Sequence, residues 1–354
     1  MSELESPQEE REMSELETAW ATARRSTVGG PLLEVADLSV RFRTEDGPVL
    51  AADQVSFTVA DREVLALVGE SGCGKSVTAM ALTRLLPSNA LITGSVRLGD
   101  RSLLELPEAR MRDVRGRDVA YVFQEPMTSL NPVLTVGKQL GEVLRRHQAM
   151  RGRTADRRAT ELLELVGIPL PSRRLKEYPH QLSGGMRQRV MIAMAVACQP
   201  RLLVADEPTT ALDVTVQAGI LDVLRDLRTE IGTAVLLITH DLGVVADLAD
   251  RVVVMYAGRT IEEAGTEALF ARHNHPYTRG LLNAVPDPER RAGGIREIPG
   301  RVPTLRSSPD ECTFADRCER ADSQCRARRP ELLPGPAGHP VRCVHPLPLP
   351  EVTR

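Results

Sequence analysis

Residues 69–76 have the composition and spacing of a loop that binds phosphate groups, since they read Gly-Glu-Ser-Gly-Cys-Gly-Lys-Ser after the apolar run 64–68. Glycines let successive backbone N–H groups surround phosphate oxygens, and a helix that begins at such a loop adds positive potential. We expect Lys75 to contact the β- and γ-phosphates of ATP, and the Ser76 hydroxyl to bind Mg²⁺. A glycine-rich turn without a ligand is the alternative for this segment alone. The expected nucleotide contacts here are Gly69, Glu70, Ser71, Gly72, Cys73, Gly74, Lys75, Ser76 and Val77.

Two adjacent carboxylates, Asp206 and Glu207, follow the apolar run 202–205, which is typical of a buried strand. A carboxylate at a strand end beside the phosphates can hold Mg²⁺ through water, and we assign this role to Asp206. The second carboxylate suits polarisation of the attacking water, which makes Glu207 the candidate catalytic base. A solvated strand end is the alternative for such a pair considered alone. Together with the phosphate loop, the pair indicates nucleotide hydrolysis.

Residues 182–189 read Leu-Ser-Gly-Gly-Met-Arg-Gln-Arg, and this sequence resembles the signature of ATP-binding-cassette (ABC) ATPases. Ser183, Gly184 and Gly185 at a helix start would present a hydroxyl and backbone donors to a γ-phosphate. The resemblance implies that this phosphate belongs to ATP held by a second subunit. Because the chain has one copy of each motif, the same resemblance implies a partner ATPase subunit, either a second copy or a paralogue.

Four more site residues follow from this resemblance. Gln124 corresponds to the glutamine that senses Mg²⁺ and faces the membrane partner, and His240 to the switch histidine that contacts the γ-phosphate. Asp213 lies in a match to the family's D-loop, Ala-Leu-Asp. Phe42 is a candidate for stacking on adenine, with an ordinary core aromatic as the alternative. The resemblance thus implies catalytic roles for Glu207, His240 and Gln124, and Mg²⁺ contacts from Ser76, Gln124 and Asp206.

Three further stretches, residues 124–132, 178–185 and 275–282, are similar to those of the ATP-binding subunits of bacterial oligopeptide, dipeptide and nickel importers. The resemblance extends from residue 32 to about residue 345. It implies an ATPase at the cytoplasmic face of the membrane that powers peptide import, with two permease subunits and an extracellular binding protein. The alternatives are a nickel or other small-solute importer, a soluble ABC ATPase acting on nucleic acid or ribosomes, and a regulatory subunit that does not hydrolyse ATP.

The composition argues against some of these alternatives. The 354 residues carry a net charge of −3, which gives no electrostatic case for binding nucleic acid. No apolar run reaches the roughly 18 residues that a membrane span requires. The amino terminus is acidic and polar, so we expect no signal peptide. We therefore expect the protein to reach the membrane only through a partner.

The elements that must position these residues alternate along the chain, which predicts an α/β fold with a mainly parallel sheet. The family resemblance implies a RecA-like core with an antiparallel β subdomain and a helical subdomain at about 130–185. We expect a flexible or disordered tail at 1–30, an ABC ATPase domain at 31–285 and a separate Cys- and Pro-rich extension at 286–354. Expected strands are 33–42, 51–59, 119–124, 202–205 and 234–239, expected helices are 76–86, 136–150, 155–166, 186–198 and 216–230, and 251–264 is an expected hairpin turning at Ala257-Gly258.

Four of the six cysteines lie close together in the sequence near the carboxyl end: Cys312, Cys318, Cys325 and Cys343. Disulfides are disfavoured in the cytosol. Four thiolates suit a [4Fe–4S] cluster, and some members of the resembling importer group carry one in a similar extension. A zinc site is a second alternative, although such sites usually begin with a shorter Cys spacing. Simple buried thiols are the third.

Overall fold

The computed structural model describes residues 30–124, 129–210, 212–284 and 298–348. An eight-stranded sheet forms its centre, in the order β11-β12-β10-β9-β3-β8-β7-β6. The strands β6, β7, β8, β3 and β9 are parallel, and β10, β12 and β11 add an antiparallel end. The bounds are β3 Val64–Val68, β6 Val119–Val122, β7 Leu202–Asp206, β8 Ala234–Thr239, β9 Arg251–Tyr256, β10 Arg259–Gly265, β11 Leu333–Pro334 and β12 Pro340–Val341.

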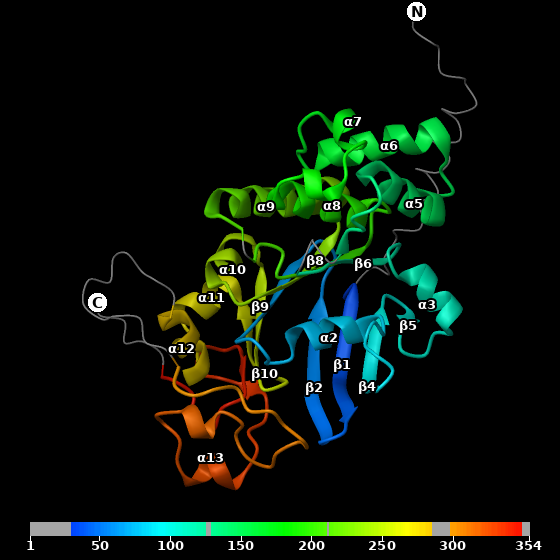
Figure 1. Ribbon diagram of the computed structural model, residues 1–354. Helices are drawn as coiled ribbons and strands as arrows, with labels where there is room; N and C mark the ends of the chain where they lie inside the picture. Colours follow the sequence, from blue (N-terminus) through cyan, green and yellow to red (C-terminus); the bar gives the residue numbers. More distant parts are fainter. Residues whose placement is uncertain (1–29, 125–128, 211, 285–297, 349–354) are drawn as a thin grey trace, which may run out of the picture.

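The parallel strands are short, apolar and buried on both faces, as parallel strands covered by helices must be. Their carboxyl ends therefore share one edge of the sheet, where loops to the following helices begin. Figure 1 shows these helices around the sheet, with α5, α6, α8 and α9 gathered beyond one end. The helix bounds are α2 Lys75–Leu82, α3 Glu108–Val114, α5 Val136–Gln148, α6 Gly152–Leu165, α7 Pro171–Arg174, α8 Gly184–Val196, α9 Val214–Asp226, α10 Leu242–Leu248, α11 Thr266–Ala271, α12 Pro276–Asn283 and α13 Ser323–Ala327.

A second, antiparallel sheet has the order β2-β1-β4-β5 and confirms the expected β subdomain. Its strands are β1 Leu33–Thr44, β2 Gly47–Val59, β4 Ala90–Leu98 and β5 Arg101–Ser102. The strand β4 was not among the expected strands, although it pairs with β1 over most of its length. Most residues of β4 are exposed or half-buried, so the apolar signal that revealed the other strands is weak there.

The predicted hairpin is present as β9 and β10, and it turns at Ala257 and Gly258, with φ of 45° and 77°. Two consecutive positive φ values are those of the tight turns that join twisted strands. The Gly258 N–H donates to the Cys73 carbonyl over 2.8 Å. The hairpin turn therefore packs directly against the expected phosphate loop.

The chain after residue 298 is not the separate appendage that we expected. Its strand β12 pairs with β10, extending the central sheet, and Phe314 is buried in a core cluster with Tyr256 and Tyr277. Phe314 meets both tyrosine rings edge-on, at centroid distances of 5.2 and 5.4 Å. This segment therefore shares a hydrophobic core cluster with strands of the central sheet.

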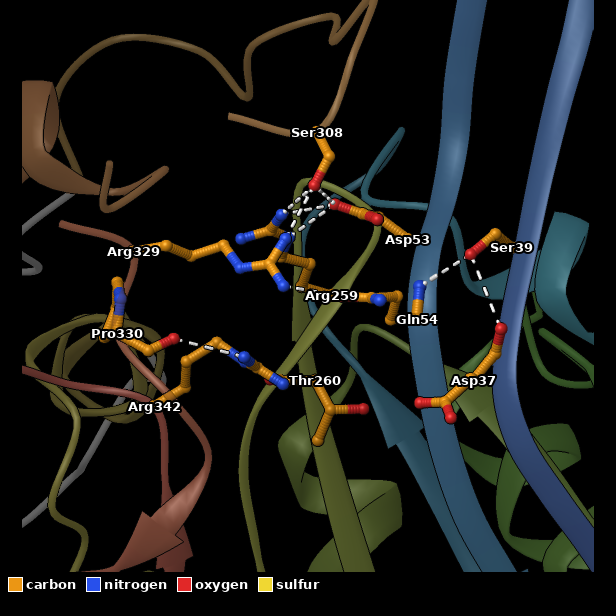
Figure 2. A network of polar contacts seen from close by, with 10 residues as sticks. All are labelled: Asp37, Ser39, Asp53, Gln54, Arg259, Thr260, Ser308, Arg329, Pro330 and Arg342. Atoms are coloured by element: carbon orange, nitrogen blue, oxygen red, sulfur yellow. Dashed lines mark hydrogen bonds and ion pairs between the residues drawn. The ribbon is translucent and has the colours of Figure 1, made fainter. Parts of the chain in front are cut away.

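A buried polar network fastens the same segment to β2 and β10 (Figure 2). Arg259, which is 2% exposed, donates to the Asp53 carboxylate over 2.7 Å. Ser308 donates to the same carboxylate over 2.9 Å and accepts from Arg329 over 2.7 Å. The Arg329 guanidinium also donates to Gln54 over 2.7 Å. Burying a carboxylate without partners costs free energy, so this network favours one fixed position of the segment against β2 and β10.

Within the described ranges, no helix combines the length and the apolar character that crossing a bilayer requires. The prediction for residues 1–30 lies outside the described residues, apart from Gly30.

Candidate functional site

The loop 69–74 joins β3 to α2 in a conformation that only glycine adopts easily at three positions. Gly69, Gly72 and Gly74 have φ of 153°, 78° and 101°. A Cβ at Gly69 would lie 2.3 Å from the Met255 carbonyl oxygen, and one at Gly74 would lie 2.3 Å from that of Ala51. Side chains at these two positions would therefore collide with neighbouring backbone, which explains the glycine spacing.

Lys75 begins α2 and is 5% exposed. Its ammonium group donates to the carbonyls of Gly69 over 2.7 Å and of Glu70 over 3.0 Å. These bonds curl the loop around the lysine, so a nucleotide phosphate would compete with two carbonyls for the ammonium protons. Burial raises the pKa of the adjacent Cys73 thiol, which packs in the core, and Val77 also packs there.

Asp206, at the end of β7, accepts a 3.1 Å hydrogen bond from the Ser76 hydroxyl. Burial raises the pKa of Asp206, and the Ser76 hydrogen bond opposes that change. The structure thus brings together the hydroxyl and the carboxylate that the sequence predicted as Mg²⁺ contacts. Both are oxygen donors, the type that Mg²⁺ prefers.

Glu207 gathers three polar side chains. Its Oε2 accepts from Gln124 over 2.9 Å and from Thr210 over 2.8 Å. Its Oε1 lies 3.1 Å from Nδ1 of His240. The residue has φ of 47°, a left-handed conformation that is uncommon for glutamate, while its N–H still donates to Ile238 of β8. Three predicted catalytic residues, far apart in the sequence, therefore meet at one carboxylate.

The residues of the predicted signature lie at the start of α8. Ser183 caps this helix by accepting from the Met186 N–H, and it is exposed together with Gly184. A Cβ at Gly185 would lie 2.4 Å from the Val216 side chain, so packing against α9 explains this glycine. A Cβ at Gly184 would meet only Leu212, at an ordinary 3.9 Å. Contacts within the described chain therefore do not explain Gly184.

Two remaining predicted contacts have local roles as well. Asp213 is exposed and caps α9, where its carboxylate accepts from the Val216 N–H over 3.0 Å. Phe42 is half-buried against the core and stands opposite Val49 in the β1–β2 register. Val49 lines a cavity of about 510 Å³ beside Ser71 and Gly72. The role of Phe42 at adenine stays a prediction.

The four late cysteines are all free thiols, partly or fully buried. The Cys312 N–H donates to the Cys325 carbonyl over 2.9 Å. Burial raises the pKa of Cys312 and Cys318, and it raises that of Cys343 to about 12. Charge on the other cysteines raises the pKa further at each of these three thiols, which places the four in one neighbourhood.

A different trio in the same region could hold a cation by ligand type. One donor atom each from Asp322, Cys325 and His345 lies within 4.8 Å of the others. The Asp322 carboxylate, however, accepts from the N–H groups of Gln324 and Cys325 and lies 2.9 Å from Nε2 of His345. Its Oδ1 thus caps α13 and its Oδ2 contacts His345, which accounts for the arrangement.

Sequence reasoning missed three residues that hold Glu207 or the phosphate loop in place. Thr210 contacts Glu207, while Tyr277 and Arg317 contact Glu70. Thr210 follows Glu207 by three residues, so a turn could have suggested it. The other two lie more than 200 residues from their partner, where local spacing gives no signal.

Comparisons with known proteins agree with this geometry. Residues 52–210 match the family described as ABC transporter, and residues 261–325 match the family described as oligopeptide/dipeptide transporter, C-terminal region. The chain is 53% identical over 315 residues to a probable peptide ABC transporter ATP-binding protein of Sinorhizobium fredii, covering 88% of this chain and 94% of that protein. It is 48% identical over 314 residues to an oligopeptide transport ATP-binding protein of Bacillus subtilis, covering 88% and 96%.

Among solved structures, the chain is similar to an ATP-binding cassette determined as a dimer in a post-hydrolysis state bound to ADP and phosphate. The TM-score is 0.59 at 27% identity, over 66% of this chain and 98% of that one.

Proposed function

The chain belongs to the ABC transporter family of ATP-binding subunits, and we propose that it hydrolyses ATP to power the import of di- or oligopeptides through a membrane complex. The single observation that carries the ATPase assignment is the meeting of Gln124, Thr210 and His240 at Glu207, next to the Asp206–Ser76 pair. The peptide assignment is supported by the match of residues 261–325 and by the names of the relatives.

Each of these side chains has a separate role in the proposed reaction. Lys75 and the loop N–H groups bind the phosphates, and Ser76 and Asp206 would hold Mg²⁺, which when bound would neutralise phosphate charge. The Glu207 carboxylate orients the attacking water in line with the γ-phosphate and accepts a proton from that water. His240 and Gln124 hold that carboxylate, and with ATP and Mg²⁺ bound they would lie near the γ-phosphate and the metal respectively.

A complete site requires a second subunit. Ser183 and Gly184 are exposed at the amino terminus of α8, where backbone donors favour an anion. Contacts among the described residues do not explain the missing side chain of Gly184, whereas close approach of a partner's phosphate would. The partner is a second copy or a paralogue, and Asp213 at the start of α9 lies on the same interface.

The membrane partners are two permeases fed by an extracellular binding protein, with this subunit peripheral at the cytoplasmic face. Phe123, Val133 and Tyr178 support this, since they are 41%, 74% and 38% exposed and apolar. Phe123 precedes Gln124, and the N–H of Val136 donates to the Glu177 carbonyl, which brings the other two segments together. Exposed apolar side chains in neighbouring segments are typical of a protein interface.

The test uses the assembled transporter in sealed vesicles, with ATP on the side of this subunit. The Glu207→Gln variant should bind ATP normally and lose peptide uptake and hydrolysis by roughly 10²–10⁴-fold. Glu267→Gln, the same change at an exposed site on α11, should behave as wild type. Near-normal hydrolysis by Glu207→Gln would overturn the catalytic role. ATP-driven uptake of nickel or another small solute without peptides would overturn the cargo.

We also propose that Cys312, Cys318, Cys325 and Cys343 hold a [4Fe–4S] cluster. A tetrahedral zinc site with bonds of about 2.3 Å needs thiolates about 3.8 Å apart. In the described chain, the metal-type donor group within 4.8 Å contains only one of the four thiols. A cluster binds each thiolate at a different iron, so wider separation within one buried neighbourhood suits it better.

The cluster is tested on anaerobically purified full-length protein. We expect a brown protein with broad visible absorbance and about four irons per chain, lost in Cys318→Ser. Cys198→Ser, at a buried cysteine far from this region in the sequence, serves as the control and should keep the colour. Colourless protein with stoichiometric zinc, or with neither metal, would overturn the proposal.

A further inference from the structure

Glu70, the second residue of the phosphate loop, is held at three points. Its backbone N–H donates to the Tyr277 hydroxyl over 2.9 Å, and Tyr277 is fully buried. Its carbonyl accepts from the Lys75 ammonium over 3.0 Å. Its carboxylate accepts from the Arg317 guanidinium over 3.0 Å. Two of these three contacts come from the carboxy-terminal third of the chain.

Arg317 joins the loop to another segment. The guanidinium also donates to the carbonyls of Pro299 over 2.6 Å, Ile298 over 3.2 Å and Gly300 over 3.4 Å. It lies over the ring of Tyr256, 5.6 Å from the centroid. A planar guanidinium offers five donors in a fixed fork, so one side chain can fix several acceptors at once.

The two segments that Arg317 joins are two walls of one cavity of about 510 Å³. One wall is residues 70–72 of the phosphate loop, and the other is residues 300–305. The backbone of Leu305 is tied to β2, because the Leu50 N–H donates to its carbonyl over 2.7 Å. One wall of the cavity beside the phosphate loop is therefore formed by a segment that lies outside the matched ATPase family region, 52–210.

Charge is as important as geometry here. The Glu70 Oε1 atom is buried and has no hydrogen-bond partner, and within the described ranges the ion-pair partner of this carboxylate is Arg317. Without Arg317, a negative group would remain unpaired where an anionic triphosphate binds. Such a group would repel the phosphates, and because the Glu70 side chain is only 28% exposed, solvent would screen it less than a fully exposed carboxylate.

We propose that Arg317 is a positioning residue for ATP binding, which holds and neutralises Glu70 and so makes residues 298–317 part of their own chain's nucleotide site. The inference rests on the proposed function, since it assumes that loop 69–76 binds ATP. Arg317 acts through Glu70, and the chemical step itself does not use it. Its loss should therefore affect ATP affinity more than turnover at saturating ATP.

The experiment measures ATP affinity by calorimetry on the full chain, and KM and kcat on the assembled transporter. Arg317→Gln should weaken ATP binding about tenfold or more, while kcat changes less than about twofold. Arg317→Lys, which keeps the charge but not the fork, should fall between Arg317→Gln and wild type. Arg328→Gln, at an exposed arginine of the same segment, should bind ATP as wild type does.

A second background separates positioning from general damage. In Glu70→Gln protein no carboxylate needs neutralising, so adding Arg317→Gln should weaken ATP binding less than about threefold. An equal loss in both backgrounds, or unchanged affinity in folded Arg317→Gln protein, overturns the inference. If Arg317→Gln does not fold, the same comparison is made with Arg317→Lys. Unchanged ATP affinity in Lys75→Ala would instead overturn the proposed function, whatever the Arg317 result.

Discussion

Gly74 lies where the phosphate loop passes closest to β2. A methyl group there would lie 2.3 Å from the Ala51 carbonyl oxygen, and the residue's φ is 101°. Gly152 also has a positive φ, of 57°, but a Cβ there would meet nothing within 4 Å. Substitutions at these two glycines therefore measure the cost of backbone strain with and without a steric collision.

We expect Gly74→Ala to lower the free energy of unfolding by about 3 kcal/mol or more and to weaken ATP binding, because strain and collision add. Gly152→Ala should cost only about 1 kcal/mol, from strain alone, and leave ATP binding intact. Urea unfolding and ATP titration measure both. Equal costs in the two variants would contradict the collision.

Substitutions of Lys75 and Glu207 should differ in their effect on ATP binding. Lys75→Ala removes a charge directed at the phosphates and should weaken ATP binding by about ten- to a hundredfold, with turnover falling as well. Glu207→Gln should spare binding and trap the ATP-bound pair of subunits. A direct binding titration distinguishes the two, and unaltered affinity in Lys75→Ala would count against its assignment.

At the scale of elements, α12 connects the core to the phosphate loop through Tyr277. The helix is capped by His275, whose Nδ1 accepts from the Tyr277 N–H over 3.0 Å. Burial lowers the pKa of His275 from 6.5 to about 4. The folded state thus keeps this histidine neutral where the unfolded chain would protonate it.

The sign of the pH dependence follows. Above about pH 6.5 neither state binds the proton, so His275 has no effect there. Between pH 6.5 and 4 the unfolded state alone binds it, which lowers stability by up to about 3 kcal/mol. We expect His275→Asn, which can still cap α12, to lose less stability over this range in urea unfolding. A pH profile parallel to wild type would exclude this contribution.

Elements were predictable where one local signal decided them. Contiguous apolar runs revealed β3, β7 and β8, and the Ala257-Gly258 turn revealed β9 and β10. The strand β4 was not predicted, because most of its residues are exposed or half-buried and give no apolar pattern. Its pairing with β1 makes it a strand. Among site residues, Lys75, Asp206 and Glu207 followed from motif spacing. Arg317 did not, because its partner lies 247 residues away.

At the scale of the molecule, the proposed pairing divides each ATP site between two chains, with loop 69–76 from one chain and Ser183 from the other. We expect the isolated chain to be monomeric and a poor ATPase, gaining activity with its partner and permeases, because Ser183 must act across an interface. Sedimentation and ATPase assays on one preparation test this. Full activity in a strictly monomeric sample would contradict it.

A mixing experiment tells self-pairing from pairing with a paralogue. If two copies pair, Lys75→Ala and Ser183→Ala chains are each impaired alone. A mixed pair then has one site with both motifs intact, so activity should recover to roughly half of wild type at most in such pairs. No recovery on mixing would point to a paralogous partner.

During protein synthesis, Glu70 is made before two of the residues that hold it in the folded chain. The ribosome makes Glu70 long before Tyr277 and Arg317, which follow by 207 and 247 residues. At about 5–20 residues per second, that interval is roughly 12–50 seconds. During it a nascent chain already has the phosphate loop, and later every recognised ATP motif, without Arg317 and at first without Tyr277, which are two of the three residues that hold Glu70. If Arg317 positions Glu70 as proposed, a message truncated before codon 317 would encode all the ATPase motifs and release a weak ATP binder, so high affinity would be acquired only after residue 317 has been made.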